Sequence, residues 1–183
     1  MHYLNQSIGR ELPHPATVSV LIVEDVRAER MRLAAVIRRL GYNTVEARDG
    51  AEADALIAEG RIEIVLSDWQ MPAVGGVDLC KRIVSRDRNP PYFILMTGRD
   101  QPEDLVTGLD AGADDFMHKP ATAAELRVRL QAGLRVLQMR RELGQRACEA
   151  RVAKRRIRQL ELELEWTHAQ ASAASSIQRQ SHA

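Results

Sequence analysis

Long apolar runs are missing from this sequence of 183 residues. No stretch approaches the roughly 18 consecutive apolar residues that a membrane-spanning helix needs. Residues 1–17 also lack the apolar core of a secretory signal. We therefore expect a cytoplasmic protein without a membrane partner.

Cysteine is scarce, and an excess of one charge is missing. Cys80 and Cys148 are too few and too isolated for a disulfide framework or a zinc site, so we interpret them as buried or idle thiols. The net charge is +1, and this total gives no reason to expect nucleic acid or an acidic membrane as a partner. Neither a G-x-x-x-x-G-K-[ST] phosphate loop nor a G-x-G-x-x-G fingerprint occurs.

Five short apolar runs alternate with segments in which apolar residues recur at helical spacing. The runs cover residues 18–23, 42–47, 62–67, 92–97 and 115–118, and the helical segments cover 27–40, 50–60, 76–85 and 102–112. Continuous apolar character indicates strands that are buried on both faces. The alternation predicts a flavodoxin-like α/β fold, with a doubly wound five-stranded parallel sheet of strand order 2-1-3-4-5. We expect Asp49 to cap the second helix, and Gly41, Gly60 and Gly112 to end helices.

Proline is absent after Pro120, and a helical pattern that opens near Thr122 continues to about residue 178. Heptad positions a and d are apolar in ten of thirteen cases, which predicts a coiled coil. The a positions are Val136, Leu143, Ala150, Ile157, Leu164, Ala171 and Gln178, and the d positions are Met139, Arg146, Ala153, Leu160, Thr167 and Ala174. We expect a loose tail over residues 1–17, a globular domain over 18–133 and a coiled-coil helix over 134–183.

Charges beside the a and d positions favour a parallel homodimer through residues 136–178. The attractive pairs of a g position with the following e position are Glu149 with Lys154, Arg156 with Glu161, and Glu163 with His168, whereas Arg135 and Arg140 repel. The alternative is a single amphipathic helix folded back on its own domain. The alanines at a and d positions (the seam of the coiled coil), together with Arg146, predict that the two helices pair only modestly. Gly133 weakens a helix by about 1 kcal/mol and is a candidate for a flexible joint.

Polar residues follow four of the predicted strands, at the edge where a doubly wound sheet binds its ligands. Glu24 and Asp25 follow the first strand, Asp68 the third, Thr97 the fourth and Lys119 the fifth. Taken singly, each is a common helix cap, turn former or solvated charge. Five such residues at one edge of the sheet favour a ligand-binding site over these separate structural roles.

The chemistry of these side chains predicts phosphoryl transfer. Three converging carboxylates repel one another unless a cation lies among them. Oxygen ligands without histidine or cysteine favour a hard ion such as Mg²⁺. The Lys119 ammonium and the Thr97 hydroxyl supply the countercharge and the hydrogen-bond donor that a phosphoryl group needs. A carboxylate held in line with that group can act as the nucleophile and form an acyl phosphate.

Four motifs resemble the receiver domain of two-component response regulators in order and spacing. They are "ED" at 24–25, "DWQMP" at 68–72, "TG" at 97–98 and "GADDFMHKP" at 112–120, and the match covers about residues 18–133. The resemblance implies that Asp68 is the phosphoacceptor, which takes a phosphoryl group from a sensor histidine kinase or a histidine phosphotransfer protein. A receiver is a phosphoacceptor, so no enzyme activity is expected of this chain.

The resemblance also implies roles for the neighbouring residues. Mg²⁺ or Mn²⁺ would be bound by Asp25 and Asp68 directly, by Glu24 through water and by the backbone carbonyl of Gln70. Thr97 and Lys119 would contact the phosphoryl oxygens, Thr97 and Phe116 would form the switch, and Gln70 and Arg99 would tune dephosphorylation. The Lys119–Pro120 bond resembles the family's cis peptide.

Two positions depart from the family's pattern. Glu24 replaces the commoner Asp, which a water-mediated metal contact tolerates. Phe116 replaces the frequent Tyr and has no hydroxyl, so a switch at this position must work by packing. A haloacid-dehalogenase-like phosphatase resembles D-x-D, and Gln70 at the second position after Asp68 argues against it.

The C-terminal helix leaves the output open. The last residues, "ASAASSIQRQSHA", favour a chain cut before an output domain, and such helices resemble those that precede a diguanylate cyclase or a PP2C-like phosphatase. A stand-alone receiver with a dimerising tail is the other interpretation. Eleven Lys or Arg against two Glu in residues 127–158 raise a third, a phosphorylation-dependent nucleic-acid-binding regulator. No helix-turn-helix follows, so nucleic acid is the weaker hypothesis.

Overall fold

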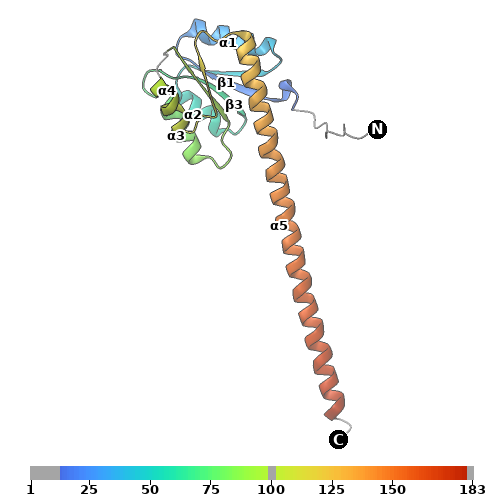
Figure 1. The fold of residues 1–183 in the computed structure, drawn as a ribbon. Helices are drawn as coiled ribbons and strands as arrows, with labels where there is room; N and C mark the ends of the chain where they lie inside the picture. Colours follow the sequence, from blue (N-terminus) through green and yellow to red (C-terminus); the bar gives the residue numbers. More distant parts are fainter. Residues whose placement is uncertain (1–12, 99–101, 181–183) are drawn as a thin grey trace, which may run out of the picture. The chain divides into compact units, whose positions relative to one another are not determined.

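Five parallel strands form the centre of the fold in the computed structural model, which describes residues 13–98 and 102–180 (Figure 1). The strands are β1 (Ser19–Val23), β2 (Asn43–Ala47), β3 (Ile64–Asp68), β4 (Tyr92–Thr97) and β5 (Asp115–His118). Their order is β2-β1-β3-β4-β5, so the predicted fold and strand order are confirmed. The third strand begins two residues later than predicted and extends through Asp68, because its ladder with β4 pairs Asp68 with Met96.

Burial of the strands follows their place in the sheet. Every residue of β3 and β4 is buried, and β1 is buried after its first residue. The edge strands β2 and β5 are only partly covered. Continuous apolar sequence is therefore found where helices cover both faces of a strand.

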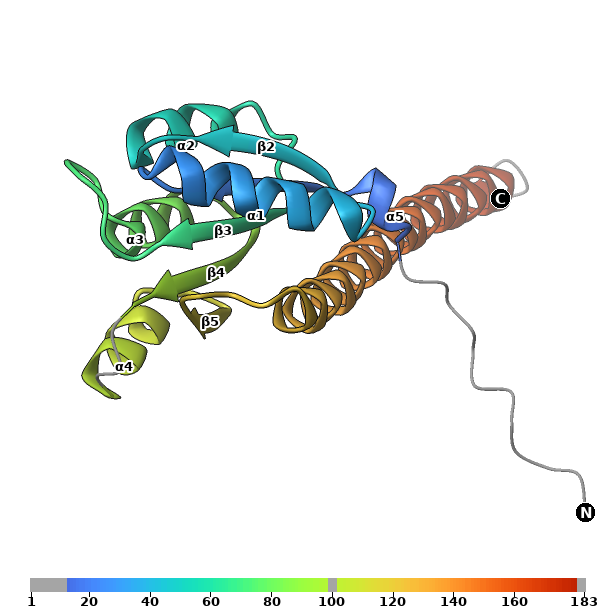
Figure 2. The same cartoon turned by 90° about the horizontal axis from the view of Figure 1, so that it is seen from above.

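Helices cover both faces of the sheet (Figure 2). They are α1 (Arg27–Arg39), α2 (Gly50–Ala58), α3 (Gly76–Arg86), α4 (Pro102–Asp110) and α5 (Ala123–Gln180), and a short 3-10 helix precedes β1 at Pro15–Thr17. One apolar cluster joins α1 and the start of α5 to one face of the sheet. The other joins α2 and α3 to the opposite face, where Gly108 of α4 also approaches Leu95. The right-handed crossovers of parallel strands produce this three-layer arrangement.

The helix boundaries depend on the predicted capping residues. The Asp49 side chain accepts a hydrogen bond of 2.8 Å from the backbone of Glu52 at the start of α2. Gly41, Gly60 and Gly112 have φ values of 92°, 79° and 94°, a conformation that favours glycine. These predictions are confirmed.

Helix α5 is unbroken from Ala123 to Gln180, and the contacts divide the chain into two units within it. The first unit extends to Gln138, and the second begins at Met139. Within the first unit, Leu126, Leu130, Leu134 and Leu137 are buried at helical spacing. Gly133 is buried as well, and a Cβ there would lie 2.9 Å from Cδ1 of Tyr92. Close packing therefore explains a glycine at this position.

Among the described residues, no helix combines the length and the apolar character that crossing a membrane requires. Arg99 and residues 1–12 of the predicted tail lie outside the described residues.

Candidate functional site

Three carboxylates converge at the C-terminal edge of the sheet, as the sequence predicts. Glu24 and Asp25 follow β1, and Asp68 is the last residue of β3, the neighbouring strand. One carboxylate oxygen from each residue lies within 4.8 Å of the others. Glu24 is 1% exposed, and Asp68 is 9% exposed, whereas Asp25 is open to solvent. The edge therefore presents a compact acidic cluster with one accessible side.

Lys119 contacts two of the three acids. Its Nζ lies 2.6 Å from Oε2 of Glu24 and 2.9 Å from Oδ1 of Asp68. Burial raises the pKa of Glu24 above its usual value, and the hydrogen bond from Lys119 opposes this rise. Burial alone would lower the pKa of Lys119, but its hydrogen bonds to Glu24 and Asp68 outweigh that effect and raise it. The ammonium is therefore held in its charged form between the acids.

Backbone bonds hold Thr97 and Lys119 at adjacent strand ends. Thr97 is 2% exposed at the end of β4. The backbone N–H of Lys119 donates to the carbonyl of Thr97 at 2.7 Å. The Lys119–Pro120 peptide bond is cis. Thr97, the last residue of β4, and Lys119, the residue after β5, thus lie at the same edge of the sheet as the acids.

The loop after Asp68 is held tightly at both ends. The N–H of Trp69 donates to the carbonyl of Met96 at 2.7 Å, and the N–H of Gly76 donates to the carbonyl of Trp69 at 3.0 Å. A Cβ at Gly76 would lie 2.1 Å from the carbonyl oxygen of Asp68, a distance that no side chain tolerates. Gly76 therefore lets α3 begin directly against the phosphoacceptor candidate. Gln70 is exposed in this loop.

Phe116 lies between two aromatic neighbours. Its ring meets Trp69 edge-on at 6.2 Å between centroids and His118 at 5.2 Å, with interplanar angles of 83° and 84°. Such edge-to-face pairs stabilise a packing by about 0.5–1.5 kcal/mol beyond the area that they bury. The ring is partly buried against the cluster that α2 and α3 cover. Its position is therefore determined by aromatic packing, next to the residue that follows Asp68.

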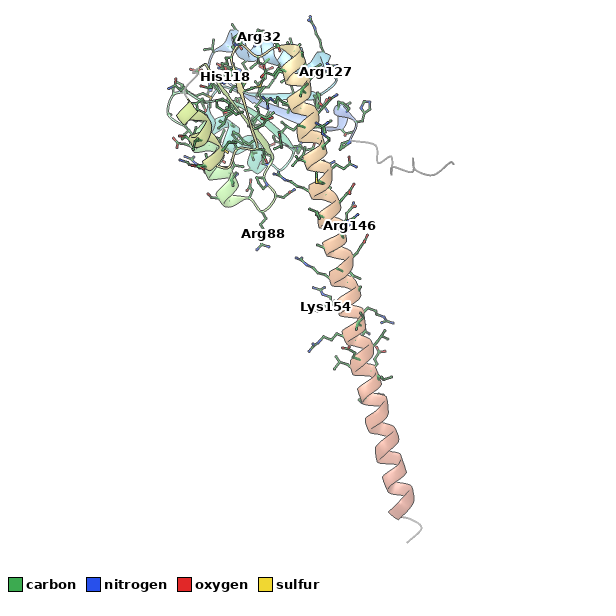
Figure 3. The ribbon with its side chains drawn as sticks, in the orientation of Figure 1. Arg32, Arg88, His118, Arg127, Arg146 and Lys154 are labelled. Atoms are coloured by element: carbon green, nitrogen blue, oxygen red, sulfur yellow. The ribbon has the colours of Figure 1, made fainter. Side chains whose placement is uncertain are left out.

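Two arginines of α1 reach the site and were not predicted. Arg30 donates to the carbonyl of Glu24 at 2.6 Å. Arg32 donates to the carbonyl of Ala121 at 3.2 Å, just after the cis bond. Arg32 and His118 lie at the same end of the first unit (Figure 3). The acceptors are backbone carbonyls, and the sequence contains no pattern that pairs a side chain with them.

The donor set fits a hard divalent cation. The three carboxylates supply oxygen only, and the described residues include no histidine or cysteine in this cluster. Mg²⁺ prefers one or two carboxylates together with waters and phosphate oxygens. Asp25 is exposed beside the buried Glu24 and Asp68, so the cluster is open to solvent on the side of Asp25.

Comparison with known families and curated proteins gives a consistent result. The family model for the response regulator receiver domain matches residues 20–131. The response regulator MprA of Mycobacterium sp. (strain KMS) is 41% identical over 118 residues, which are 64% of this chain and 51% of that protein. The sensory transduction protein RegX3 of Mycolicibacterium smegmatis is 40% identical over 117 residues, 64% of this chain and 50% of that one. The chain thus spans about half the length of the curated relatives it matches.

Solved structures resemble the same part of the chain. The receiver domain of the Francisella response regulator 1452 aligns with a TM-score of 0.61 at 29% identity, covering 64% of this chain and 97% of that one. A probable two-component system response regulator/GGDEF domain protein aligns with a TM-score of 0.64 at 28% identity, covering 68% of this chain and 52% of that one.

Proposed function

The chain belongs to the response regulator receiver family, and on that premise we propose that Asp68 accepts a phosphoryl group from a sensor histidine kinase or a histidine phosphotransfer protein. The observation that carries this proposal is the placement of Asp68 at a strand end, 2.9 Å from the Lys119 ammonium and within the acidic cluster. Receivers are phosphoacceptors of two-component systems, so the step belongs to signalling.

The transfer exchanges one bond to phosphorus for another. An Oδ atom of Asp68 attacks the phosphorus, and the phosphorus–nitrogen bond of the donor phosphohistidine breaks. The electron pair of that bond stays on the imidazole nitrogen, and an acyl phosphate forms on Asp68. Lys119 stays within reach of the added oxygens, and the Thr97 hydroxyl donates to them. Positioning and charge neutralisation by these residues favour the in-line transfer.

A divalent cation completes the site in this proposal. Asp25 and Asp68 would hold Mg²⁺ or Mn²⁺ directly, with Glu24 acting through water and the Gln70 backbone carbonyl as a further ligand. The ion would neutralise negative charge on the phosphoryl oxygens. Support comes from the oxygen-only donor set and from the proximity of the three carboxylates.

Labelling with a small phosphodonor tests the assignment. Wild-type protein incubated with acetyl phosphate and MgCl₂ is expected to gain one phosphoryl group, measured by intact-protein mass spectrometry. Asp68→Asn keeps the size of the side chain but removes the nucleophilic carboxylate, so its labelling is expected to fall to background. Omission of MgCl₂, or chelation by EDTA, is expected to have the same effect on wild type. Labelling of Asp68→Asn equal to that of wild type would contradict the assignment of Asp68 as the phosphoacceptor.

We also propose a switch made of Thr97 and Phe116. The phosphoryl group would draw the Thr97 hydroxyl toward Asp68, and the Phe116 ring would move into the space that Thr97 leaves. Phe116 has no hydroxyl, so the energy of the two ring positions depends on packing against Trp69 and His118. Support comes from the pairing of β4 with β5, in which Phe116 lies opposite Leu95, two residues before Thr97.

The signal would pass through α5 to a parallel dimer and an output domain outside this sequence. The helix is continuous from the receiver into the predicted coiled coil. Met139, Leu143, Ile157, Leu160 and Leu164 occupy a and d positions and are exposed in the single chain. A diguanylate cyclase or a PP2C-like phosphatase is the proposed output, and the likeness to a response regulator/GGDEF domain protein supports an output of this modular kind.

The basic residues of α5 favour this proposal over nucleic-acid binding. Figure 3 labels Arg146 and Lys154 on the helix beyond the first unit, and these residues occupy heptad positions d and e. Their basic neighbours Arg151, Arg155 and Arg156 occupy positions b, f and g. A nucleic-acid surface gathers such charge on one face. Charge spread around the helix is typical of a solvated coiled coil.

A further inference from the structure

Arg30 of α1 makes a contact that the family resemblance does not explain. Its guanidinium donates to the backbone carbonyl of Glu24 at 2.6 Å. Its Nε lies 3.7 Å from Oε2 of Glu46 on β2, and the Arg30 side chain is only 15% exposed. The guanidinium is therefore held between a strand residue and the first residue of the acidic pair.

The Glu24 carbonyl is at a point where the sheet no longer provides a partner. The β1 ladders end at Val23, which pairs with Ala47 and Ser67. The N–H of Glu24 still donates to the carbonyl of Ala47 at 3.2 Å. The carbonyl of this buried residue accepts its hydrogen bond from Arg30. A buried carbonyl without a hydrogen-bond partner is costly, so the Arg30 side chain supplies the hydrogen bond that a neighbouring strand would otherwise provide.

The direction of this carbonyl determines where Asp25 points. The Glu24 carbonyl and the Asp25 N–H belong to one planar peptide unit, so fixing the carbonyl fixes the path of the chain into Asp25. The Glu24 side chain is held separately, by Lys119 at 2.6 Å and by the N–H of Val26 at 3.4 Å. Arg30 is thus the side chain that binds the peptide unit between Glu24 and Asp25.

We propose that Arg30 is a positioning residue that orients the Glu24–Asp25 peptide and thereby sets the affinity of the acidic cluster for a divalent cation. The inference rests on the proposed function of this site. Loss of a group that orients metal ligands typically weakens metal binding by 10–100-fold. The described bonds of Arg30 go to the Glu24 carbonyl and to Glu46, and none goes to Asp68.

Arg38 provides a matched control on the same helix. It also pairs with Glu46, at 2.9 Å, but it has no described bond to Glu24, and its side chain is 55% exposed. Arg30→Met and Arg38→Met remove the same charge from α1 and the same partner from Glu46. Only the first removes the donor to the Glu24 carbonyl. Arg30→Lys restores a donor and the charge with a single ammonium.

The experiment titrates each variant of the 183-residue chain with MgCl₂ and follows the emission of Trp69, next to Asp68, in a Trp166→Phe background. Arg30→Met is expected to bind Mg²⁺ roughly 10-fold more weakly than the background protein. Arg38→Met is expected to match the background, and Arg30→Lys to recover most of the affinity. At saturating MgCl₂, labelling of Arg30→Met by acetyl phosphate is expected to return toward the wild-type rate, because the nucleophile is intact.

Two results would overturn the proposal for Arg30 but leave the proposed function intact. One is an unchanged Mg²⁺ affinity in Arg30→Met. The other is an equal loss of Mg²⁺ affinity in Arg38→Met, which would assign the effect to charge. If Arg30→Met does not fold, Arg30→Gln and Arg30→Lys carry the same comparison, and equal affinity in both and in the background overturns the proposal. Failure of wild type itself to bind Mg²⁺ or to take label would instead overturn the proposed function together with this inference.

Discussion

Lys119 makes the acidic cluster stable at the level of single residues. Glu24 is almost fully buried, and an unpaired carboxylate in that position would strongly favour its neutral form. The ammonium at 2.6 Å and 2.9 Å offsets part of this cost for two acids at once. The single positive charge of Lys119 therefore offsets part of the negative charge of the cluster before a cation or a phosphoryl group binds.

The two thiols differ in reactivity because their surroundings differ. Burial, helped by the charge of Asp114, raises the pKa of Cys80 to about 12. At pH 8 only roughly one Cys80 in ten thousand is then a thiolate. Cys148 is exposed on α5. Iodoacetamide at pH 8 is expected to modify Cys148 and to spare Cys80 in the folded protein, as mapped by peptide mass spectrometry.

Unfolding in urea supplies the control for this prediction, since both thiols are then expected to react. Modification of Cys80 at the rate of Cys148 in the folded protein would contradict the buried environment. Uptake of one equivalent of iodoacetamide by a Cys148→Ser variant under native conditions would also contradict the buried environment of Cys80.

At the level of elements, one helix performs two different tasks. The first part of α5 buries a leucine stripe against the sheet, as shown by Leu126, Leu130 and Leu134. From Met139 on, the described apolar side chains of the helix are exposed. Two glycines mark these environments: Gly133 meets Tyr92 and Ile64, whereas a Cβ at Gly144 would meet nothing within 4 Å.

The two glycines are expected to respond differently to substitution by alanine. Gly133→Ala gains about 1 kcal/mol of helix propensity, but its methyl group meets the buried Tyr92 ring at 2.9 Å, and overpacking of this kind costs about 1–3 kcal/mol. We expect a net loss of receiver stability in urea denaturation, followed by Trp69 emission in the Trp166→Phe background. Gly144→Ala is expected to leave that transition unchanged and to increase helical ellipticity.

A Gly133→Ala variant as stable as wild type would argue against close packing as the reason for this glycine. A flexible joint would then be the better explanation, and the variant should impair signal output without changing receiver stability.

At the level of the whole molecule, apolar side chains of α5 beyond Gln138 are exposed in the single chain, and we propose that a second copy covers them. Ile157, Leu160 and Leu164 form an exposed apolar block on this part of the helix. Isoleucine at a and leucine at d favour a parallel dimer. The weak stretch around Arg146 and Ala150 separates this block from Met139 and Leu143, so pairing is expected to be modest and open to adjustment by the receiver.

A pair of charge substitutions tests whether the a and d seam mediates dimerisation. Leu160→Glu places a carboxylate at a d position and is expected to convert a dimer to a monomer in sedimentation velocity, because a buried unpaired charge is costly. Leu162→Glu changes a residue that is also exposed, 58% against 47% for Leu160, but lies at an f position off the seam. This control is expected to remain dimeric.

Equal sedimentation of the two variants would contradict the heptad assignment. A wild-type chain that sediments as a monomer at every concentration would instead favour a helix that pairs with another part of the same protein.

The alternating pattern of apolar runs and amphipathic segments was sufficient to predict the sheet, its order and the edge at which Glu24, Asp25, Asp68, Thr97 and Lys119 gather. These features depend on period, burial and the right-handed crossover, which are local or follow from general rules. The tertiary structure alone decided the rest. It placed the Arg30 guanidinium on the carbonyl of Glu24, the residue after β1. It also brought Gly76 close to Asp68 and Gly133 close to Tyr92. Contacts with backbone atoms and close approaches leave no pattern in side-chain types, because they depend on how finished elements pack in space.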